Sequence, residues 1–227
     1  MCEAMTETVV ALVPMRHHSE RVPGKNYRKF GGVPLYHHIV QRLLACPQIS
    51  QIVIDTDSPI IVSDATEYFP QVTLLERPPH LRADDVSMND VLLHDISQVG
   101  EGYYLQTHST NPLLQAETIQ AAITRFFGAH DADSLFGVTR WQTRLYDAHG
   151  TPLNHDPRVL LRTQDLPPVF EENSNLYLFS SDTLRRVGRR IGDQPILFEI
   201  DREEALDIDT EADFTMAEIM YTKGKRE

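Results

Sequence analysis

The feature that most constrains the fold is an alternation of short, β-branched apolar runs with longer amphipathic segments. Five runs have the composition of buried strands: residues 9–13, 52–55, 72–75, 103–106 and 134–138. Four segments have the apolar spacing of helices: residues 35–46, 60–69, 89–97 and 116–127. Strands that alternate with helices in this way predict an α/β fold, in which a mainly parallel sheet carries helices on both faces.

The pattern changes after Val138, where the chain becomes rich in Pro, Asn, Asp and Arg. We expect an excursion lobe at about 140–172, which leaves the sheet and returns as a strand at 176–179. Its apolar residues are too few for an independent core: Trp141, Leu145, Tyr146, Leu160, Leu161 and Phe170. The sequence therefore predicts one domain, residues 1–227, with a small lobe that packs against a second subunit.

Composition and charge exclude several classes of protein. The 227 residues carry a formal net charge of -12, with 41% hydrophobic and 24% charged residues, as in an ordinary globular domain. We expect no binding to nucleic acid or to an anionic membrane, because both attract a net basic surface. Cys2 and Cys46 are the only cysteines, which favours a reducing compartment. The first residues do not have the pattern of a secretory signal, so we expect a cytoplasmic protein.

Positive charge gathers in one place, directly after the first predicted strand. Five basic residues lie within "PMRHHSERVPGKNYRK": Arg16, Arg21, Lys25, Arg28 and Lys29. Only Glu20 opposes them. Ligands of parallel sheets bind beyond the carboxyl ends of the strands, and Arg and Lys suit phosphate oxygens. The stretch lacks the Walker A pattern, and two interpretations stay open: a phosphate-binding loop or a solvated basic surface.

A pair of carboxylates lies near the other end of the chain, in "LDIDTEADF". A strand at 206–209 would place Asp207 and Asp209 on the same face, where they form a hard-oxygen site suited to Mg²⁺. The alternative is that one of them only caps the next helix. Thr210 and Asp213 have the spacing of a capping box, which predicts a helix start at this point.

A basic loop for phosphates and a carboxylate pair for Mg²⁺ are the parts that nucleotidyl transfer needs. A zinc site is not expected, because neighbouring histidines such as His17 and His18 do not share a helix or strand face and the H-E-x-x-H pattern is absent. The G-x-S-x-G pattern of a serine nucleophile is also absent.

The stretch "ALVPMRHHSERVPGKN" resembles the opening motif of the CMP-sugar-acid synthetases, which include the CMP-sialic acid (acylneuraminate) and CMP-Kdo synthetases. Further segments resemble motifs of the same family: "IVIDTDSPII", "ERPPHLRADDVSMNDVL", "LQTHSTNPLL", "RTQDLPPVFEENSNLYLFS" and "DIDTEADF". The similarities run in order over about residues 9–218, and this ordered set is specific for the family.

The resemblance implies a Rossmann-like α/β fold and a homodimer built through the excursion lobe. It also implies a Mg²⁺-dependent reaction, in which CMP is transferred from CTP to a 2-keto sugar acid and pyrophosphate is released. The partners would then be CTP and an acidic sugar acceptor.

The resemblance also assigns site residues. Those implied to contact the nucleotide are Arg16, Ser19, Arg21, Lys25, Asn26, Arg77 and Ser87. Those implied to contact the sugar acid are Gln106, Arg144, Arg162, Asn173 and Tyr177. Asp207 and Asp209 would hold Mg²⁺, and Arg16, Lys25 and Asp209 would act in catalysis.

Some motif positions differ from the family: Glu20 replaces Lys beside Arg21, Thr163 replaces Arg beside Arg162, and Glu171 and Glu172 replace a basic-and-Pro pair. A glutamate that faced a 2-keto acid would repel its carboxylate. We therefore expect Glu171 and Glu172 to point away, with Arg162 or Arg144 receiving that carboxylate. One alternative is a different acceptor: an amino-substituted acceptor, a different nonulosonic acid, a sugar phosphate or a phosphonate. The other is a nucleotide-binding protein without catalytic activity.

Overall fold

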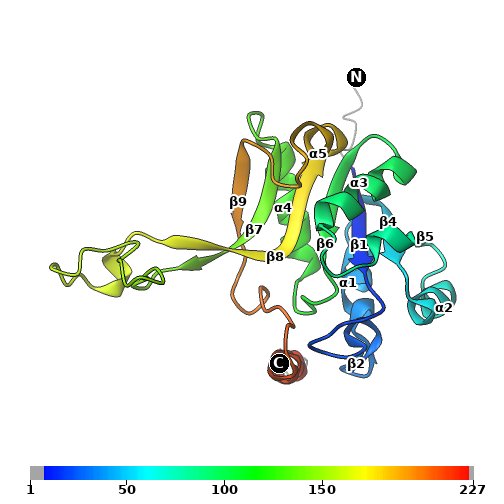
Figure 1. Ribbon diagram of the computed structural model, residues 1–227, viewed down its shortest axis with the longest axis horizontal. Helices are drawn as coiled ribbons and strands as arrows, with labels where there is room; N and C mark the ends of the chain where they lie inside the picture. The colour runs from blue at the N-terminus through cyan, green and yellow to red at the C-terminus, as the bar shows by residue number, and fades with distance from the viewer. Residues whose placement is uncertain (1–7, 225–227) are drawn as a thin grey trace.

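The computed structural model describes residues 8–224 and contains a seven-stranded sheet with helices on both faces (Figure 1). The strands of this sheet are β1 (Val9–Met15), β4 (Ile49–Thr56), β5 (Thr73–Glu76), β6 (Tyr103–Thr107), β7 (Ser134–Trp141), β8 (Val169–Ser180) and β9 (Pro195–Glu199). The α-helices are α1 (Leu35–Leu44), α2 (Pro59–Tyr68), α3 (Met88–Val99), α4 (Ala116–Phe127), α5 (Ser181–Val187) and α6 (Glu211–Gly224). The five early strands and four early helices predicted from the sequence are all present, with ends that differ by at most three residues.

The sheet order is β5-β4-β1-β6-β8-β7-β9. Four pairs of neighbouring strands are parallel: β1 with β4, β1 with β6, β4 with β5, and β7 with β9. β8 is antiparallel to both of its neighbours. The carboxyl ends of the parallel strands therefore lie at one edge of the sheet, together with the amino end of β8. The predicted mainly parallel α/β sheet is confirmed, and ligands of such sheets bind at this edge.

Two apolar clusters fill the space between the sheet and its helices. On one face, Ala11 and Val13 of β1 pack with side chains of α1, α2 and α4. On the other face, Leu12 packs with Leu92 of α3 and Leu184 of α5. This division follows from strand geometry, because successive side chains point to opposite faces. Burial on both faces explains why the strand sequences are continuous apolar runs.

A third apolar cluster joins the two ends of the chain. Ile208 packs with Val22 and Phe30, and all three side chains are fully buried. Residues 206–209, predicted as a strand, are irregular, and Ile208 N donates to Thr110 O at 2.9 Å. The prediction of a strand was wrong because Ile208 is held by the packing of its side chain and not by pairing with a strand. That side chain lies against the loop after β1 and against a short hairpin formed by β2 (Lys29–Phe30) and β3 (Val33–Pro34).

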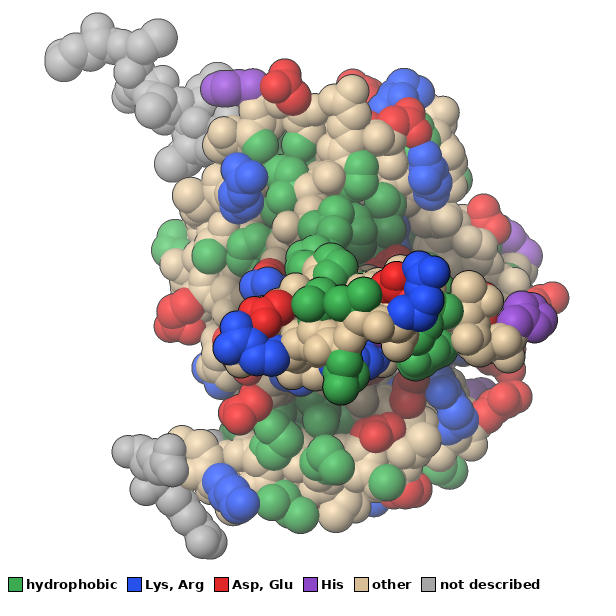
Figure 2. Space-filling view, turned by 90° about the vertical axis from the view of Figure 1, so that its left-hand side faces the viewer, with side chains coloured by type: hydrophobic (Ala, Val, Ile, Leu, Met, Phe, Trp, Pro, Cys, Tyr) green, Lys and Arg blue, Asp and Glu red, His purple; other side chains and the backbone are tan. Residues whose placement is uncertain are grey.

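β7 and β8 continue beyond the sheet as a two-stranded stem, with Arg140 opposite Phe170 and Trp141 opposite Val169. Residues 142–168 form a lobe at the tip of this stem, which projects from the left of the sheet (Figure 1). Large apolar side chains lie exposed on the stem and lobe (Figure 2): Tyr146, Leu153, Val159, Leu160, Leu161 and Phe170. Leu160 is 86% exposed, so within one chain these six side chains remain exposed to water, although Leu166 is buried.

No helix within residues 8–224 is long and apolar enough to cross a membrane. Cys46 is a buried free thiol that donates to Ala116 O at 3.4 Å, so it packs as a small core residue. Cys2 lies outside the described residues.

Candidate active site at the carboxyl ends of the strands

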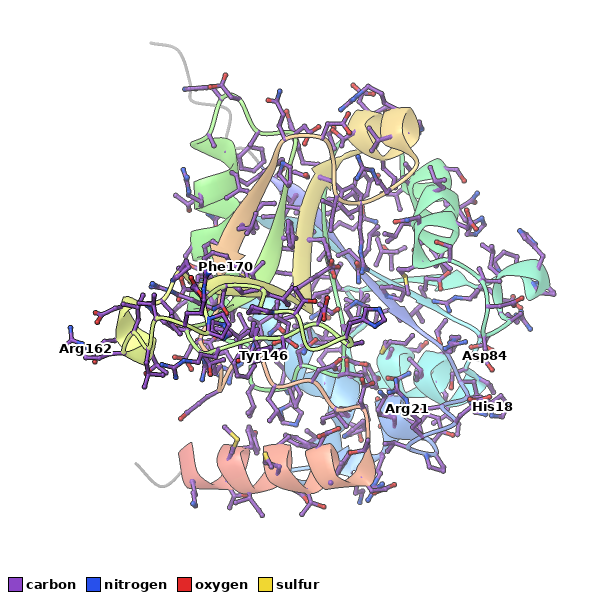
Figure 3. The ribbon with its side chains drawn as sticks, turned by 60° about the vertical axis from the view of Figure 1, so that its left-hand side comes forward. His18, Arg21, Asp84, Tyr146, Arg162 and Phe170 are labelled. Carbon is purple, nitrogen blue, oxygen red and sulfur yellow. The ribbon has the colours of Figure 1, made fainter. Side chains whose placement is uncertain are left out.

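A cleft of about 590 Å³ opens where β1 and β6 end. It is lined by the loop after β1, the segment after β6, and side chains from distant parts of the chain that include Arg77, Arg190, Asp207 and Asp209. Figure 3 shows His18, Arg21 and Asp84 gathered at this end of the sheet, whereas the labelled lobe residues lie on the other side. The cleft lies at the edge of the sheet where the topology places a ligand site.

The loop after β1 is tied to its surroundings by hydrogen bonds at both ends. At its start, His17 N donates to Asp57 Oδ1 at 2.7 Å. At its end, Asn26 Nδ2 donates to Arg16 O at 2.8 Å, and Asn26 Oδ1 accepts from Ser109 Oγ at 2.7 Å. Asn26 was predicted to lie near the nucleotide; it lines the cleft and fastens this loop to the segment that follows β6.

The five basic residues of the opening stretch divide into two groups. Arg16, Arg21 and Lys25 line the cleft, together with Ser19. Arg28 turns away, donates to both carboxylate oxygens of Glu211 at 2.7 Å and holds the start of α6, and Lys29 is exposed. Three of the five cations therefore share one cleft, and the other two do not.

Carboxylates face the three cations that line the cleft. Arg21 Nη2 donates to Asp209 Oδ1 at 2.7 Å, and Arg16 pairs with Asp84. Lys25 is more enclosed than either arginine, with a side chain that is 12% exposed. Its Nζ donates to Ile208 O at 2.5 Å and lies 3.8 Å from Asp209 Oδ1. Burial lowers the pKa of Lys25, and the carboxylates of Asp207 and Asp209 oppose that shift.

Asp207 has a buried carboxyl oxygen that no hydrogen bond satisfies among the described residues. Burial raises the pKa of its carboxyl, and the nearby charge of Asp209 adds to that shift. Its Oδ1 is buried and has no hydrogen-bond partner among the described residues. Two carboxylates on one cleft, one of them with an unpaired oxygen, provide the hard ligands that Mg²⁺ takes, so the residues present fit this ion.

Helix capping does not account for these two carboxylates. Asp213 Oδ2 accepts from Thr210 N at 2.7 Å, and Thr210 Oγ1 accepts from Asp213 N at 3.3 Å. The predicted capping box is confirmed, and Asp213 supplies the carboxylate within it. The alternative that Asp207 or Asp209 serves only as the helix cap is wrong.

Arg77, predicted to lie near the cytosine or ribose, is a buried arginine that reaches the cleft. Its Nε donates to Asp55 at the end of β4, and its backbone N donates to Thr56 O at 3.0 Å. Ser87, also predicted to contact the nucleotide, lies at the start of α3. Its Oγ accepts from Asn89 N at 3.2 Å and caps α3, and it is not one of the residues that line the cleft.

A second buried carboxyl, Asp95 of α3, lies against Asp55 and Arg77. Burial and the neighbouring Asp55 charge raise the pKa of Asp95 to about 8. Both Asp95 oxygens and Asp55 Oδ2 lack a hydrogen-bond donor among the described residues. A proton on Asp95 supplies that donor, because a protonated carboxyl can donate to Asp55 while Asp55 stays ionised against Arg77.

The predicted sugar-binding residues fall in two places. Gln106 and Tyr177 are cross-strand neighbours on β6 and β8. Arg190 donates from Nη1 to Gln106 Oε1 at 2.6 Å, its Cζ lies 3.5 Å from the Tyr177 ring centroid, and it lines the cleft itself. In the lobe, Arg144 donates to Leu161 O and Arg162 donates to Asp165 Oδ2 at 2.7 Å. Neither lobe arginine lines the cleft of its own chain.

The residues before β8 enters the sheet also differ from expectation. Asn173 is buried, and its Nδ2 donates to Thr139 Oγ1 at 3.2 Å, whereas its neighbour Ser174 lines the cleft. Glu171 accepts from Trp141 Nε1 at 2.6 Å and points away from the cleft, as expected. Glu172 accepts from the Tyr177 hydroxyl and lies 3.7 Å from Arg190 Nη2, and it is not one of the residues that line the cleft.

Several residues that line the cleft were not predicted from the sequence, among them Asp84, His108, Ser174 and Arg190. Arg190 is the one that brings a positive charge. It is the last arginine of "RRVGRR", a run that resembles ordinary surface charge. Arg186 and Arg189 pair with Asp193 at 2.8 and 2.6 Å on the surface, and Arg185 pairs with Glu101. Nothing in the spacing distinguishes Arg190 from the others, and only the path of the chain after α5 brings it to the cleft.

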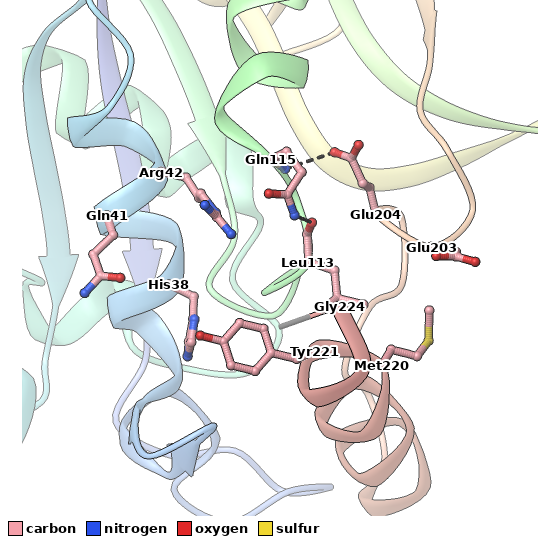
Figure 4. Close-up of a pocket in the computed structure, with 10 residues that line it drawn as sticks. All are labelled: His38, Gln41, Arg42, Leu113, Gln115, Glu203, Glu204, Met220, Tyr221 and Gly224. Carbon is pink, nitrogen blue, oxygen red and sulfur yellow. Dashed lines mark hydrogen bonds between the residues drawn. The ribbon is translucent and has the colours of Figure 1, made fainter. Parts of the chain in front are cut away.

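A second pocket, of about 440 Å³, lies between α1 and α6 (Figure 4). Its walls include Arg42, Gln115, Glu203 and Glu204, and none of the predicted site residues lines it. The cleft at the strand ends is therefore the candidate active site, because it alone of these two brings the motif residues together.

The buried carboxyl pair leads to a prediction about stability. The pKa of Asp95 is about 8 in the folded chain and near its ordinary value of 3.8 when the chain is unfolded. Protonated Asp95 therefore contributes fully to the stability of the folded state below about pH 4, and this contribution is lost as the pH rises to about 8. Asp95→Asn keeps a donor for Asp55 and removes the titration. Relative to wild type, its free energy of unfolding should rise by on the order of a few kcal/mol from pH 4 to pH 8.

Urea denaturation at several pH values measures this difference. Asp131→Asn, at an exposed position after α4, is the matched control and should follow the wild-type profile. Parallel profiles for wild type and Asp95→Asn would show that Asp95 does not hold the proton.

Comparison with known proteins agrees with the motifs. Residues 10–225 match the family model described as "Cytidylyltransferase". The chain is 23% identical over 218 residues to the N-acylneuraminate cytidylyltransferase of Streptococcus agalactiae serotype V. The alignment covers 90% of this chain and 51% of that relative, so this chain spans about half the length of that protein. It is 24% identical over 225 residues to the pseudaminic acid cytidylyltransferase of Campylobacter jejuni serotype O:2, with 93% of this chain and 95% of the relative covered.

Among solved structures, CMP:2-keto-3-deoxy-manno-octonic acid synthetase complexed with CTP aligns with a TM-score of 0.69 at 14% identity, over 97% of this chain and 100% of that one. A structure of 4-diphosphocytidyl-2C-methyl-D-erythritol synthase also aligns with a TM-score of 0.69, at 16% identity, over 95% of this chain and 98% of that one. These two likenesses concern the fold. Together with the family match and the ordered motifs, they confirm the resemblance to the CMP-sugar-acid synthetases: the chain belongs to the cytidylyltransferase family.

Proposed function

We propose that this chain is a Mg²⁺-dependent cytidylyltransferase that transfers CMP from CTP to a 2-keto sugar acid. The observation that carries the proposal is the cleft that Arg16, Arg21 and Lys25 line together with Asp207 and Asp209, where Arg21 and Lys25 lie beside Asp209. Cations for phosphate oxygens and carboxylates for a metal ion are the two halves of a nucleotidyl-transfer site. Relatives named as N-acylneuraminate and pseudaminic acid cytidylyltransferases support the choice of acceptor class.

The chemistry is a single displacement at the α-phosphorus of CTP. The anomeric hydroxyl oxygen of the sugar acid forms a bond to that phosphorus, and the bond to the bridging oxygen of the β-phosphate breaks. The hydroxyl loses its proton to solvent, and pyrophosphate leaves with the bridging oxygen. Catalysis of such a transfer depends on holding the reactants in line and on neutralising charge, with little covalent work for the protein.

The residues of the cleft have separate parts in this reaction. Arg16 and Arg21 are exposed enough to exchange their carboxylate partners for phosphate oxygens, with side chains that are 40% and 64% exposed. Lys25 is fixed by Ile208 O and by the Asp209 carboxylate, so its positive charge is held at a defined position for a phosphate group. Asp207 and Asp209 would hold Mg²⁺, which supplies further neutralisation of phosphate charge when bound. Arg77 lines the same cleft as an oriented donor for the nucleoside.

A direct test supplies the purified protein with CTP, Mg²⁺ and one acceptor at a time. The panel contains N-acetylneuraminic acid, pseudaminic acid, 2-keto-3-deoxy-manno-octonic acid, a sugar phosphate and a phosphonate. We expect one pyrophosphate per CMP-sugar formed with at least one of the sugar acids. Release with only the phosphate or the phosphonate would assign another acceptor class, and CTP binding without release in any reaction would indicate a non-catalytic protein.

We also propose that two copies associate through the stem and lobe. The lobe leaves Leu160 86% exposed and Leu153 60% exposed, and it has too few apolar residues to bury them by itself. Exposed apolar groups of this size on a projecting element are typical of a subunit contact.

Sedimentation velocity at micromolar concentration tests this association. Wild type should sediment as a species of twice the 25.9 kDa chain mass, because the exposed apolar side chains are buried in the dimer. Leu160→Asp should shift the distribution toward the monomer, whereas Met216→Asp, at a 54% exposed position of α6, should not. A monomeric wild type would reject the proposal.

The placed charge of Lys25 gives a prediction about catalysis. Lys25→Met should lower kcat/KM for CTP by about tenfold or more, because a charge-assisted contact to phosphate is lost from a shielded position. Lys29→Met removes the same charge from an exposed position four residues later and should change kcat/KM by less than about twofold. Steady-state pyrophosphate release measures both, with thermal denaturation as the check on folding. Equal losses would mean that diffuse positive charge holds CTP.

A further inference from the structure

Arg190 is held in one orientation at the wall of the cleft. Its side chain is 17% exposed, and its backbone N donates to Asn89 Oδ1 at 3.1 Å at the start of α3. The guanidinium carbon lies 3.5 Å from the centroid of the Tyr177 ring, and Nη1 donates to Gln106 Oε1 at 2.6 Å. One face and one N–H of the guanidinium are thus used by the protein, and an arginine has five N–H donors.

The charge of Arg190 is not closely matched by a carboxylate of the described residues. Glu172 lies 3.7 Å from Nη2, beyond a normal hydrogen bond, and its Oε1 already accepts from the Tyr177 hydroxyl. The surface arginines nearby behave differently, since Arg186 and Arg189 pair with Asp193 at 2.8 and 2.6 Å. An enclosed guanidinium with a loose partner favours an anionic ligand, because a planar carboxylate can accept two of its N–H groups.

The position of Arg190 relative to the phosphate-binding residues indicates which anion it binds. His108 lines the cleft together with Arg190 and Lys25, and its Nε2 is 2.8 Å from Gln106 Nε2. Burial, with the charges of Arg190 and Lys25, lowers the pKa of His108 to about 3, so the side chain is neutral. In a 2-keto sugar acid, the anomeric carbon carries both the attacking hydroxyl and the carboxylate. A carboxylate anchor must therefore share the cleft with the residues that bind the phosphates, and Arg190 lines that cleft with Lys25 and Arg16.

We propose that Arg190 binds the carboxylate of the acceptor sugar acid, with Gln106 and Tyr177 as the residues that orient its guanidinium. The inference rests on the proposed function, and it replaces Arg144 and Arg162, which lie in the lobe and make other contacts. Glu172 accepts from the Tyr177 hydroxyl, and so helps to hold the ring against which the Arg190 guanidinium lies.

The test compares Arg190→Gln and Arg190→Lys with the matched control Arg189→Gln, on whichever sugar acid of the panel wild type uses fastest. Arg190→Gln should raise the KM for the sugar acid by about tenfold to a hundredfold, because a bidentate charged contact is lost, with the Kd for CTP within about twofold. Arg190→Lys keeps the positive charge but cannot make the bidentate contact of a guanidinium, so its KM for the sugar acid should lie between those of Arg190→Gln and wild type. Arg189→Gln should leave both constants unchanged.

A second measurement separates a carboxylate contact from a structural role. The methyl ester of the same sugar acid should be a much poorer acceptor than the free acid for wild type. For Arg190→Gln this preference should shrink to within a few-fold, since the group that distinguishes acid from ester is gone. An unchanged KM in Arg190→Gln, or a preserved preference for the free acid, would overturn the inference while leaving the proposed function in place. If wild type uses no 2-keto sugar acid, the acceptor class and this inference are both wrong.

Discussion

The architecture of the candidate active site depends on one contact between the two ends of the chain, where Ile208 is buried against Val22 and Lys25 Nζ donates to Ile208 O. Ion pairs as exposed as Arg21 with Asp209 contribute little to folding, because water screens them. Burial of Ile208 beside Val22 contributes more, since both side chains are removed fully from water. Apolar packing therefore brings the acidic segment to the basic loop, and the charges are left to bind ligands.

Several polar groups of the site are costly to the folded chain when no ligand is bound. Asp207 Oδ1 is buried without a partner among the described residues, and burial shifts the pKa values of Lys25, Asp207 and Arg190 against their charged forms. Such groups are typical of functional sites, where a ligand supplies the missing partner. Arg77 differs in that Asp55 balances its charge and holds its orientation inside the protein.

The sequence predicted what depends on local pattern and did not predict what depends on the path of the chain. The strands around β1 were predictable because burial on both faces makes them continuous apolar runs, and the Thr210–Asp213 cap was predictable from its spacing. Residues 206–209 were predicted as a strand because the pattern of Ile208 between two aspartates is the same in an extended segment without a ladder. Arg190 has no local signal, since tertiary structure alone separates it from its surface neighbours.

The central claim is that Asp207 and Asp209 bind a metal ion that works with the cations of the loop after β1. Calorimetric titration of CTP into wild type and Asp207→Asn, each with and without Mg²⁺, tests it most directly. The account predicts that Mg²⁺ strengthens CTP binding to wild type and that Asp207→Asn loses most of this gain, while its affinity without Mg²⁺ stays equal to that of wild type or rises. An Asp207→Asn variant that keeps the full gain from Mg²⁺ would contradict the account.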